Sequence, residues 1–104
     1  MSWEIKYSEL AIADLGEIYE YIYYELSAPI SAKRIVNKIR KEIADLGEMP
    51  YAFRRYRKEP WKSRNMRCMN VDNYLVFYIP DEDEQAVFVL RIIHGSADYE
   101  NRLF

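Results

Sequence analysis

The chain has 104 residues, of which 50% are hydrophobic and 31% are charged, and its formal net charge is −2. These values fit one folded domain over residues 1–104 and exclude an intrinsically disordered chain. With a single cysteine, Cys68, and a single histidine, His94, the sequence excludes an internal disulfide and a cysteine- or histidine-rich zinc site, so we expect no metal and no cofactor.

The first 17 residues carry acidic side chains and contain no apolar run of the length found in signal peptides. Nowhere does the sequence approach the roughly 20 consecutive apolar residues of a membrane-spanning helix. A lone cysteine also fits a reducing compartment. We therefore expect a cytoplasmic protein with no membrane partner.

Residues 3–7 alternate between apolar and charged side chains, which predicts a short strand with one wet face. Ser8 is a typical N-cap for a helix that follows. Gly16 lowers the propensity of that helix by up to about 1 kcal/mol, so packing of its apolar stripe must hold it in place. The stripe consists of Ala11, Leu15, Ile18, Ile22 and Leu26.

A second helix is predicted to begin at Pro29, because proline fits the first turn of a helix and not its interior. Gly47 is a natural C-cap residue, and Pro50 follows it. Few residues separate the two helices, so they should form an antiparallel hairpin. The apolar stripe of the second helix consists of Ala32, Ile35, Ile39, Ile43 and Leu46.

The segment 51–67 shows no clear periodicity and concentrates positive charge. Residues 54–67 contain seven bases and one acid, a net charge of +6, whereas the rest of the chain carries −8. Aromatic residues alternate with these cations, a composition typical of surfaces that bind nucleic acid, although an acidic protein could use the same cations. A solvated loop whose aromatic rings belong to the core is the structural alternative. The candidate binding residues are Arg54, Arg55, Arg57, Lys58, Trp61, Lys62 and Arg64.

Three strands complete the chain. Residues 67–71 and 74–79 flank Asp72-Asn73, a dipeptide suited to a tight hairpin turn. Residues 74–79 are apolar on both faces, which indicates a central strand. After an acidic turn at 80–85, residues 86–94 should pair antiparallel with 74–79. The order β-α-α-β-β-β predicts an α+β fold in which the helical hairpin packs on a mainly antiparallel sheet.

Arg91 places a permanent charge in the apolar strand 86–94, on the face that alternation assigns to Val87, Val89 and Ile93. A buried guanidinium must find a carboxylate, carbonyl groups or solvent. Either Arg91 is paired inside the fold, for example with a helix carboxylate, or its face opens into a groove where it meets a phosphate.

Three other side chains could take part in chemistry. His94 could act as an acid or base near neutral pH, and Cys68 together with His94 could form a nucleophilic pair. Cys68 falls within a strand, however, and a free cysteine is usually a core residue. Tyr99 offers a phenol for hydrogen bonding or packing.

The sequence resembles the RelE/ParE superfamily of type II toxins over nearly its whole length. That family characteristically carries an R-x-L-x-V-x-x-Y-x-x-x-Y hairpin, a short acidic turn, and V-x-V-L-R-I-x-H-G-R-R-D. The matching residues here are Arg67, Met69, Val71, Tyr74 and Tyr78, followed by Val87, Val89, Leu90, Arg91, Ile92, His94, Gly95 and Asp98.

The resemblance implies a small toxin of a toxin–antitoxin system, of the kind associated with plasmid stabilization, held inactive by a cognate antitoxin that wraps it, often with a helix in a groove. The RelE branch is an mRNA interferase, a metal-independent endoribonuclease that cleaves messenger RNA on the ribosome. The ParE branch is a DNA gyrase inhibitor and is not a nuclease. A homodimer and a toxin–antitoxin hetero-oligomer are both compatible with the sequence.

Two departures bear on the target. The second arginine of the family's H-G-R-R-D run, which the RelE branch uses in cleavage, is Ala97 here. Another RelE arginine would fall near Asn70 or Val71 on the hairpin, and it is absent too. The chain is therefore closer to ParE. If it were a nuclease, its candidate catalytic residues would be Arg67, Arg91, His94 and Tyr99. The alternative is a degenerate, non-toxic module that only binds the antitoxin and helps to regulate its operon.

Overall fold

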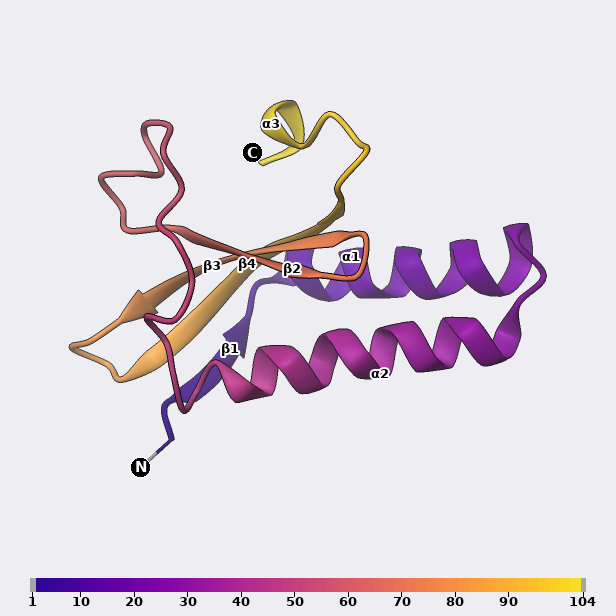
Figure 1. Ribbon diagram of the computed structural model, residues 1–104, viewed down its shortest axis with the longest axis horizontal. Coiled ribbons are helices and arrows are strands. Elements are labelled where there is room, and N and C mark those ends of the chain that lie inside the picture. The colour runs from indigo at the N-terminus through magenta and orange to yellow at the C-terminus, as the bar shows by residue number, and fades with distance from the viewer. Residues whose placement is uncertain (1, 104) are drawn as a thin grey trace.

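The computed structural model describes residues 2–103 and places two antiparallel helices against one face of a four-stranded sheet (Figure 1). The sheet consists of β1 (Glu4–Tyr7), β2 (Arg67–Val71), β3 (Tyr74–Asp81) and β4 (Ala86–His94) in the spatial order β1-β4-β3-β2. β1 pairs parallel with β4, and the other two pairings are antiparallel. The predicted α+β class and mainly antiparallel sheet are confirmed.

The first helix, α1 (Glu9–Glu20), starts where the sequence predicts. The Ser8 hydroxyl oxygen accepts a hydrogen bond from the Ala11 amide at 3.0 Å, and the hydroxyl donates to the Leu90 carbonyl at 2.7 Å. Ser8 therefore caps the helix and also attaches it to β4. α1 continues into a π-helical turn, η1 (Tyr21–Glu25), before the chain reverses at Ser27, which has a positive φ of 51°.

This π-turn alters the predicted stripe of the first helix. Ala11, Ile18 and Ile22 are buried and Leu15 is half-buried, but Leu26 is 55% exposed, so its predicted place in the stripe is wrong. A π-turn takes more residues per turn than an α-helix, and it rotates later positions away from the stripe.

The second helix, α2 (Pro29–Asp45), has Pro29 in its first turn and buries Ala32, Ile39 and Ile43. Gly47 follows the helix as predicted but does not adopt a positive φ. A Cβ atom at this position would lie 2.5 Å from Ser2 Oγ and 2.6 Å from the Trp3 carbonyl oxygen. The Trp3 amide donates to the Gly47 carbonyl at 2.8 Å, so glycine allows the N-terminal segment to lie against the end of α2.

The β2–β3 hairpin turns at Asp72, which has a positive φ of 52°. β3 is central and largely buried on both faces, as predicted, but it continues through Pro80 and Asp81. Pro80 pairs with Val87 and Asp81 with Ala86, so these two residues are strand rather than turn.

A register shift in β4 changes which residues share a face. Phe77 pairs with Arg91 and Tyr78 with Val89, so Leu90 is an extra residue on β4. Val87, Val89 and Ile92 therefore belong to the core between the sheet and the helices, whereas Ile93 belongs to the opposite cluster. The prediction that Val87, Val89, Arg91 and Ile93 share one face is wrong, because strict alternation does not allow for the bulge.

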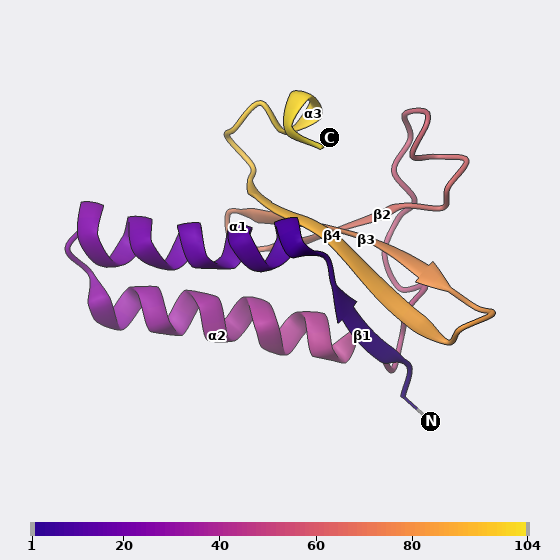
Figure 2. The same ribbon diagram turned by 180° about the vertical axis from the view of Figure 1, so that it is seen from behind.

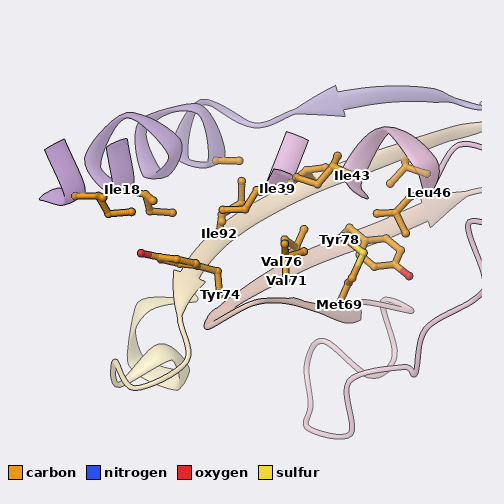
Figure 3. Packing of buried hydrophobic residues seen from close by; sticks show 14 of the residues in the cluster. Ile18, Ile39, Ile43, Leu46, Met69, Val71, Tyr74, Val76, Tyr78 and Ile92 are labelled. Atoms are coloured by element: carbon orange, nitrogen blue, oxygen red, sulfur yellow. The ribbon is translucent and has the colours of Figure 1, made fainter. Parts of the chain in front are cut away.

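Figure 3 shows the larger core, in which Ile39 and Ile43 of α2 face Val76 and Tyr78 of β3. The opposite face of the sheet carries a smaller cluster of Met66, Phe77, Ile93 and Leu103. A short helix that the sequence did not predict, α3 (Tyr99–Arg102), and the segment 54–66 lie on this side, away from α1 and α2 (Figure 2).

Candidate functional site

The segment 54–64, which we call the basic loop, projects from one end of the sheet (Figure 1). Its cations are exposed. Among the ion pairs formed within residues 2–103, one involves a cation of this loop: Lys58 pairs with Glu100 at 2.6 Å. The only acid in the loop, Glu59, accepts hydrogen bonds from the Ser63 hydroxyl and amide, which lower its pKa. The positive charge is therefore gathered on one loop and left largely uncompensated. The exposed cations are Arg54, Arg55, Arg57, Lys58, Lys62 and Arg64.

Three aromatic residues within and next to the basic loop pack into the fold. Phe53 packs against the larger core, and Tyr56 and Trp61 pack against the smaller cluster. The guanidinium of Arg64 lies 5.2 Å from the centre of the Trp61 ring. These rings anchor the loop and orient its cations outward, which fits pairing with phosphates or carboxylates better than stacking on bases.

Arg67 holds the base of the loop. It donates to the Phe53 carbonyl at 2.6 Å and its guanidinium lies 5.1 Å from the ring centre of Tyr51. Burial raises the pKa of the neighbouring Tyr78 to about 12, and the positive charge of Arg67 opposes that rise.

Arg91 is the centre of a buried network. Its Nε and Nη2 donate to the two carboxylate oxygens of Asp14 at 2.8 and 2.9 Å, and the Ile92 amide donates to Asp14 at 2.9 Å. Asp14 and Arg91 are 4% and 9% exposed. Arg91 Nη1 also donates to the Arg102 carbonyl of α3. Arg91 is therefore paired inside the fold and joins α1, β4 and the C-terminal segment.

A cleft of about 280 Å³ lies beside this network and is lined in part by Asp14, Glu17, Tyr21 and His94. The Ser96 amide donates to His94 Nδ1 at 3.1 Å, so the neutral ring carries its proton on Nε2. The His94 ring stands edge-on to Tyr74, with 5.2 Å between ring centres.

The four candidate catalytic residues do not form one site, because Arg67 and His94 lie far apart and Arg91 and Tyr99 are held by contacts within the fold. Arg67 pairs with Tyr78, whereas His94 pairs with Tyr74, so they lie four residues apart along β3, roughly 13 Å at the usual strand rise. Arg91 is bonded to Asp14, and the Tyr99 ring packs 5.8 Å from that of Phe77.

The proposed pair of Cys68 and His94 is not formed either. Cys68 lies on β2, opposite Phe77, and His94 lies on β4, so β3 separates them. Burial raises the pKa of the Cys68 thiol to about 11, which suits a packed side chain rather than a nucleophile.

A groove of about 530 Å³ runs between α1 and α2 and was not identified from the sequence. Ile12 stands beside it 60% exposed, and a Cβ added to Gly16 would meet no atom within 4 Å. Tyr7 lies at the end of this groove. Burial raises the pKa of the Tyr7 phenol, and the positive charge of Arg40 partly opposes this rise. The helical stripes predict which face each helix buries, but they do not predict a groove that forms only where the two helices meet. The lining comprises Tyr7, Ile12, Leu15, Gly16, Tyr19, Glu20, Val36 and Arg40.

Residues 5–99 match the family described as ParE toxin of type II toxin-antitoxin system, parDE. No curated protein sequence matches the chain closely enough to count as a relative. Within the described residues, each helix is too short or too polar to cross a membrane.

The fold is similar to several solved structures. A chain of the chromosomal ParDE system from P. aeruginosa superposes with a TM-score of 0.73 at 21% identity, covering 89% of this chain and 96% of that one. A chain of the RelBE2 complex from Mycobacterium tuberculosis gives 0.66 at 21% identity, with coverages of 90% and 99%. A double arginine-to-alanine mutant of E. coli RelE in the free state gives 0.68 at 14% identity, with coverages of 98% and 93%.

Proposed function

Because the chain belongs to the ParE toxin family of type II toxin–antitoxin systems, we propose that it inhibits growth by acting on DNA gyrase and that a cognate antitoxin neutralises it. The family match over residues 5–99 is the observation that carries the proposal. The wide spacing of Arg67 and His94 along β3 supports it, because a nuclease needs its proton-transferring and phosphate-binding groups around one phosphate.

The target is tested with purified protein in two parallel reactions. We expect the protein to stop supercoiling by gyrase and to accumulate cleaved DNA complexes. In translating ribosomes we expect messenger RNA to stay intact. Cut messenger together with unaffected supercoiling would contradict the gyrase target and assign the ribosome instead.

Toxicity itself is tested by induced expression without any antitoxin. Growth should stop on induction and resume when the antitoxin is supplied from a second plasmid. Unimpaired growth with a folded protein would contradict the toxin role and favour the alternative, a degenerate module that binds the antitoxin and contributes to autoregulation of the operon.

An acidic antitoxin segment is the partner that fits the basic loop. The loop holds six exposed cations, and Lys58 is the one that forms an ion pair within residues 2–103. Replacing Arg54, Arg55 and Arg57 by glutamate should weaken antitoxin binding and reduce its dependence on salt. As a control, Glu82→Lys and Glu84→Lys change exposed charge on the β3–β4 turn and should leave the affinity unchanged. Equal affinity of both variants and the wild type would exclude this contact.

The groove between α1 and α2 fits an apolar helix face of the same antitoxin. Gly16 offers a specific test, because open space at its Cβ position lets a large side chain enter the groove. Gly16→Trp should reduce antitoxin affinity at least tenfold while the fold is kept. Gly16→Ala, which barely enters the groove, is the matched control. Wild-type affinity of the Gly16→Trp variant would exclude the groove from the interface.

A further inference from the structure

The end of α1 and the π-turn η1 carry a second charged surface, which we call the tyrosine–glutamate patch. A hollow of about 290 Å³ on this surface is lined by Glu17, Glu20, Tyr21, Tyr24 and Glu25. Tyr21 and Tyr24 are 55% and 70% exposed. Residues 8–26 contain five acids and no base. Exposed phenol rings among carboxylates attract cations, through the faces of the rings and through ion pairing.

The cleft beside the Arg91 network extends this patch, since it shares Glu17 and Tyr21 with the hollow. Asp14 in the cleft is already bonded to Arg91, so Glu17 supplies the negative charge at the shared rim. Arg102 also lines the cleft and is itself a cation, so a second cation would be attracted to Glu17 rather than to Arg102. The patch is therefore a shaped surface with room for an arginine or lysine side chain.

The chain itself carries a surface of the matching kind. The basic loop has exposed cations at the end of the molecule opposite η1, as the two views in Figures 1 and 2 agree. The molecule is 42 Å long, so the loop and the patch of one chain do not reach each other.

We propose that the basic loop of one copy binds the tyrosine–glutamate patch of a second copy, so that the protein associates head to tail. The contact joins two different surfaces, so a bound pair as a whole still presents one free loop on one copy and one free patch on the other. Further copies can therefore add to the pair, as an open chain or a closed ring, so assembly is not limited to a symmetric dimer. This inference rests on charge and shape and is independent of the toxin's target.

Sedimentation velocity of the purified protein tests the association. At about 20 mM salt, where the Debye length is about 20 Å, the weight-average mass should rise with concentration to at least about twice that of a monomer. At about 1 M salt, where the Debye length is about 3 Å, it should return to the monomer mass of 12.5 kDa. A mass of 12.5 kDa at low salt and all concentrations would overturn the proposal.

Two variants test the surfaces separately. The Glu20→Lys, Glu25→Lys variant reverses two charges of the patch and leaves the basic loop unchanged. The Arg54→Glu, Arg55→Glu, Arg57→Glu variant reverses three charges of the loop and leaves the patch unchanged. Each variant alone should stay monomeric. Their mixture contains one intact loop and one intact patch, so it should form a 1:1 complex of twice the monomer mass that grows no further.

A matched control places the same charge change elsewhere. Glu82→Lys with Glu84→Lys alters two exposed acids on the β3–β4 turn, and this variant should associate as the wild type does. Association of either surface variant alone, or a mixture that stays monomeric at low salt, would overturn the proposal. Thermal unfolding of all three variants checks that each is folded.

Discussion

Arginine has two different roles in this chain. Arg91 is buried and makes hydrogen bonds to Asp14 and to the Arg102 carbonyl, so its charge is satisfied within the fold. Arg54, Arg55 and Arg57 are exposed, and the ion pairs formed among residues 2–103 do not include them. The same side chain type therefore stabilises the structure at one position and is free to meet a partner at the others.

A double-mutant cycle measures the buried pair. Asp14→Leu or Arg91→Met should each lower the free energy of unfolding by about 3–5 kcal/mol, because each strands a buried charge. The double variant removes both charges and should cost no more than either single change. Urea unfolding of the four proteins gives these values. Costs that simply add would mean that the two side chains do not depend on each other.

Stability should also fall at high pH through Cys68. Burial raises the pKa of its thiol from the usual 9.0 to about 11 in the folded chain. Between these pH values the unfolded chain loses the proton and the folded chain keeps it, so the free energy of unfolding falls by up to about 1.4 kcal/mol per pH unit. The Cys68→Ala variant keeps every tyrosine, which also titrates at high pH, and loses only the thiol. Its free energy of unfolding should therefore fall less steeply with pH than that of the wild type. Parallel curves for the two proteins would contradict this prediction.

At the level of elements, replacing either of two glycines by alanine should change the free energy of unfolding in opposite directions. Gly47→Ala should lower the free energy of unfolding by about 1–3 kcal/mol, because its Cβ would overlap Ser2 Oγ and the Trp3 carbonyl oxygen. Gly16→Ala should raise it by about 1 kcal/mol, since the site is helical, exposed and open. Thermal or urea unfolding measures both. Equal effects at the two sites would contradict the packing at the end of α2.

Local signals allowed most elements to be predicted. The Ser8 cap, Pro29 in the first turn of α2 and the turn at Asp72 depend on neighbouring residues, and all three are confirmed. The extra residue at Leu90 and the π-turn η1 do not follow from local patterns, because tertiary packing decides where a strand bulges or a helix widens.

The candidate site was predictable in its charge but not in its partners. A count of bases locates the basic loop without any structure. The partner of Arg91 is Asp14, 77 residues away in the chain, and only the packing of α1 on β4 brings them together. The groove at Gly16 was missed for a related reason, since it forms only when two helices lie side by side.

At the scale of the whole molecule, the basic loop and the acidic first helix lie apart. The basic loop lies at one end, and the acidic helix α1 with η1 extends to the other (Figure 1). A protein that used these charges for its own stability would pair them, yet four ion pairs are found among residues 2–103 and the loop contributes one cation to them.

Reversing the loop charges should therefore leave the fold intact. Arg54→Glu with Arg55→Glu and Arg57→Glu should change the free energy of unfolding by no more than about 0.5 kcal/mol per site, as expected for exposed positions. The melting temperature of this variant is the measurement. A large fall would mean that these arginines support the structure and are not reserved for a partner.

The parallel pairing of β1 with β4 has a consequence for synthesis. The neighbour of β1 in the sheet is β4, so β1 cannot join the sheet until the ribosome has synthesised residues 86–94. During that interval the two helices can already form, with the apolar sides that will meet the sheet still uncovered. In a nascent chain, β4 must therefore emerge from the ribosome before the helices can bury these apolar sides against a complete sheet.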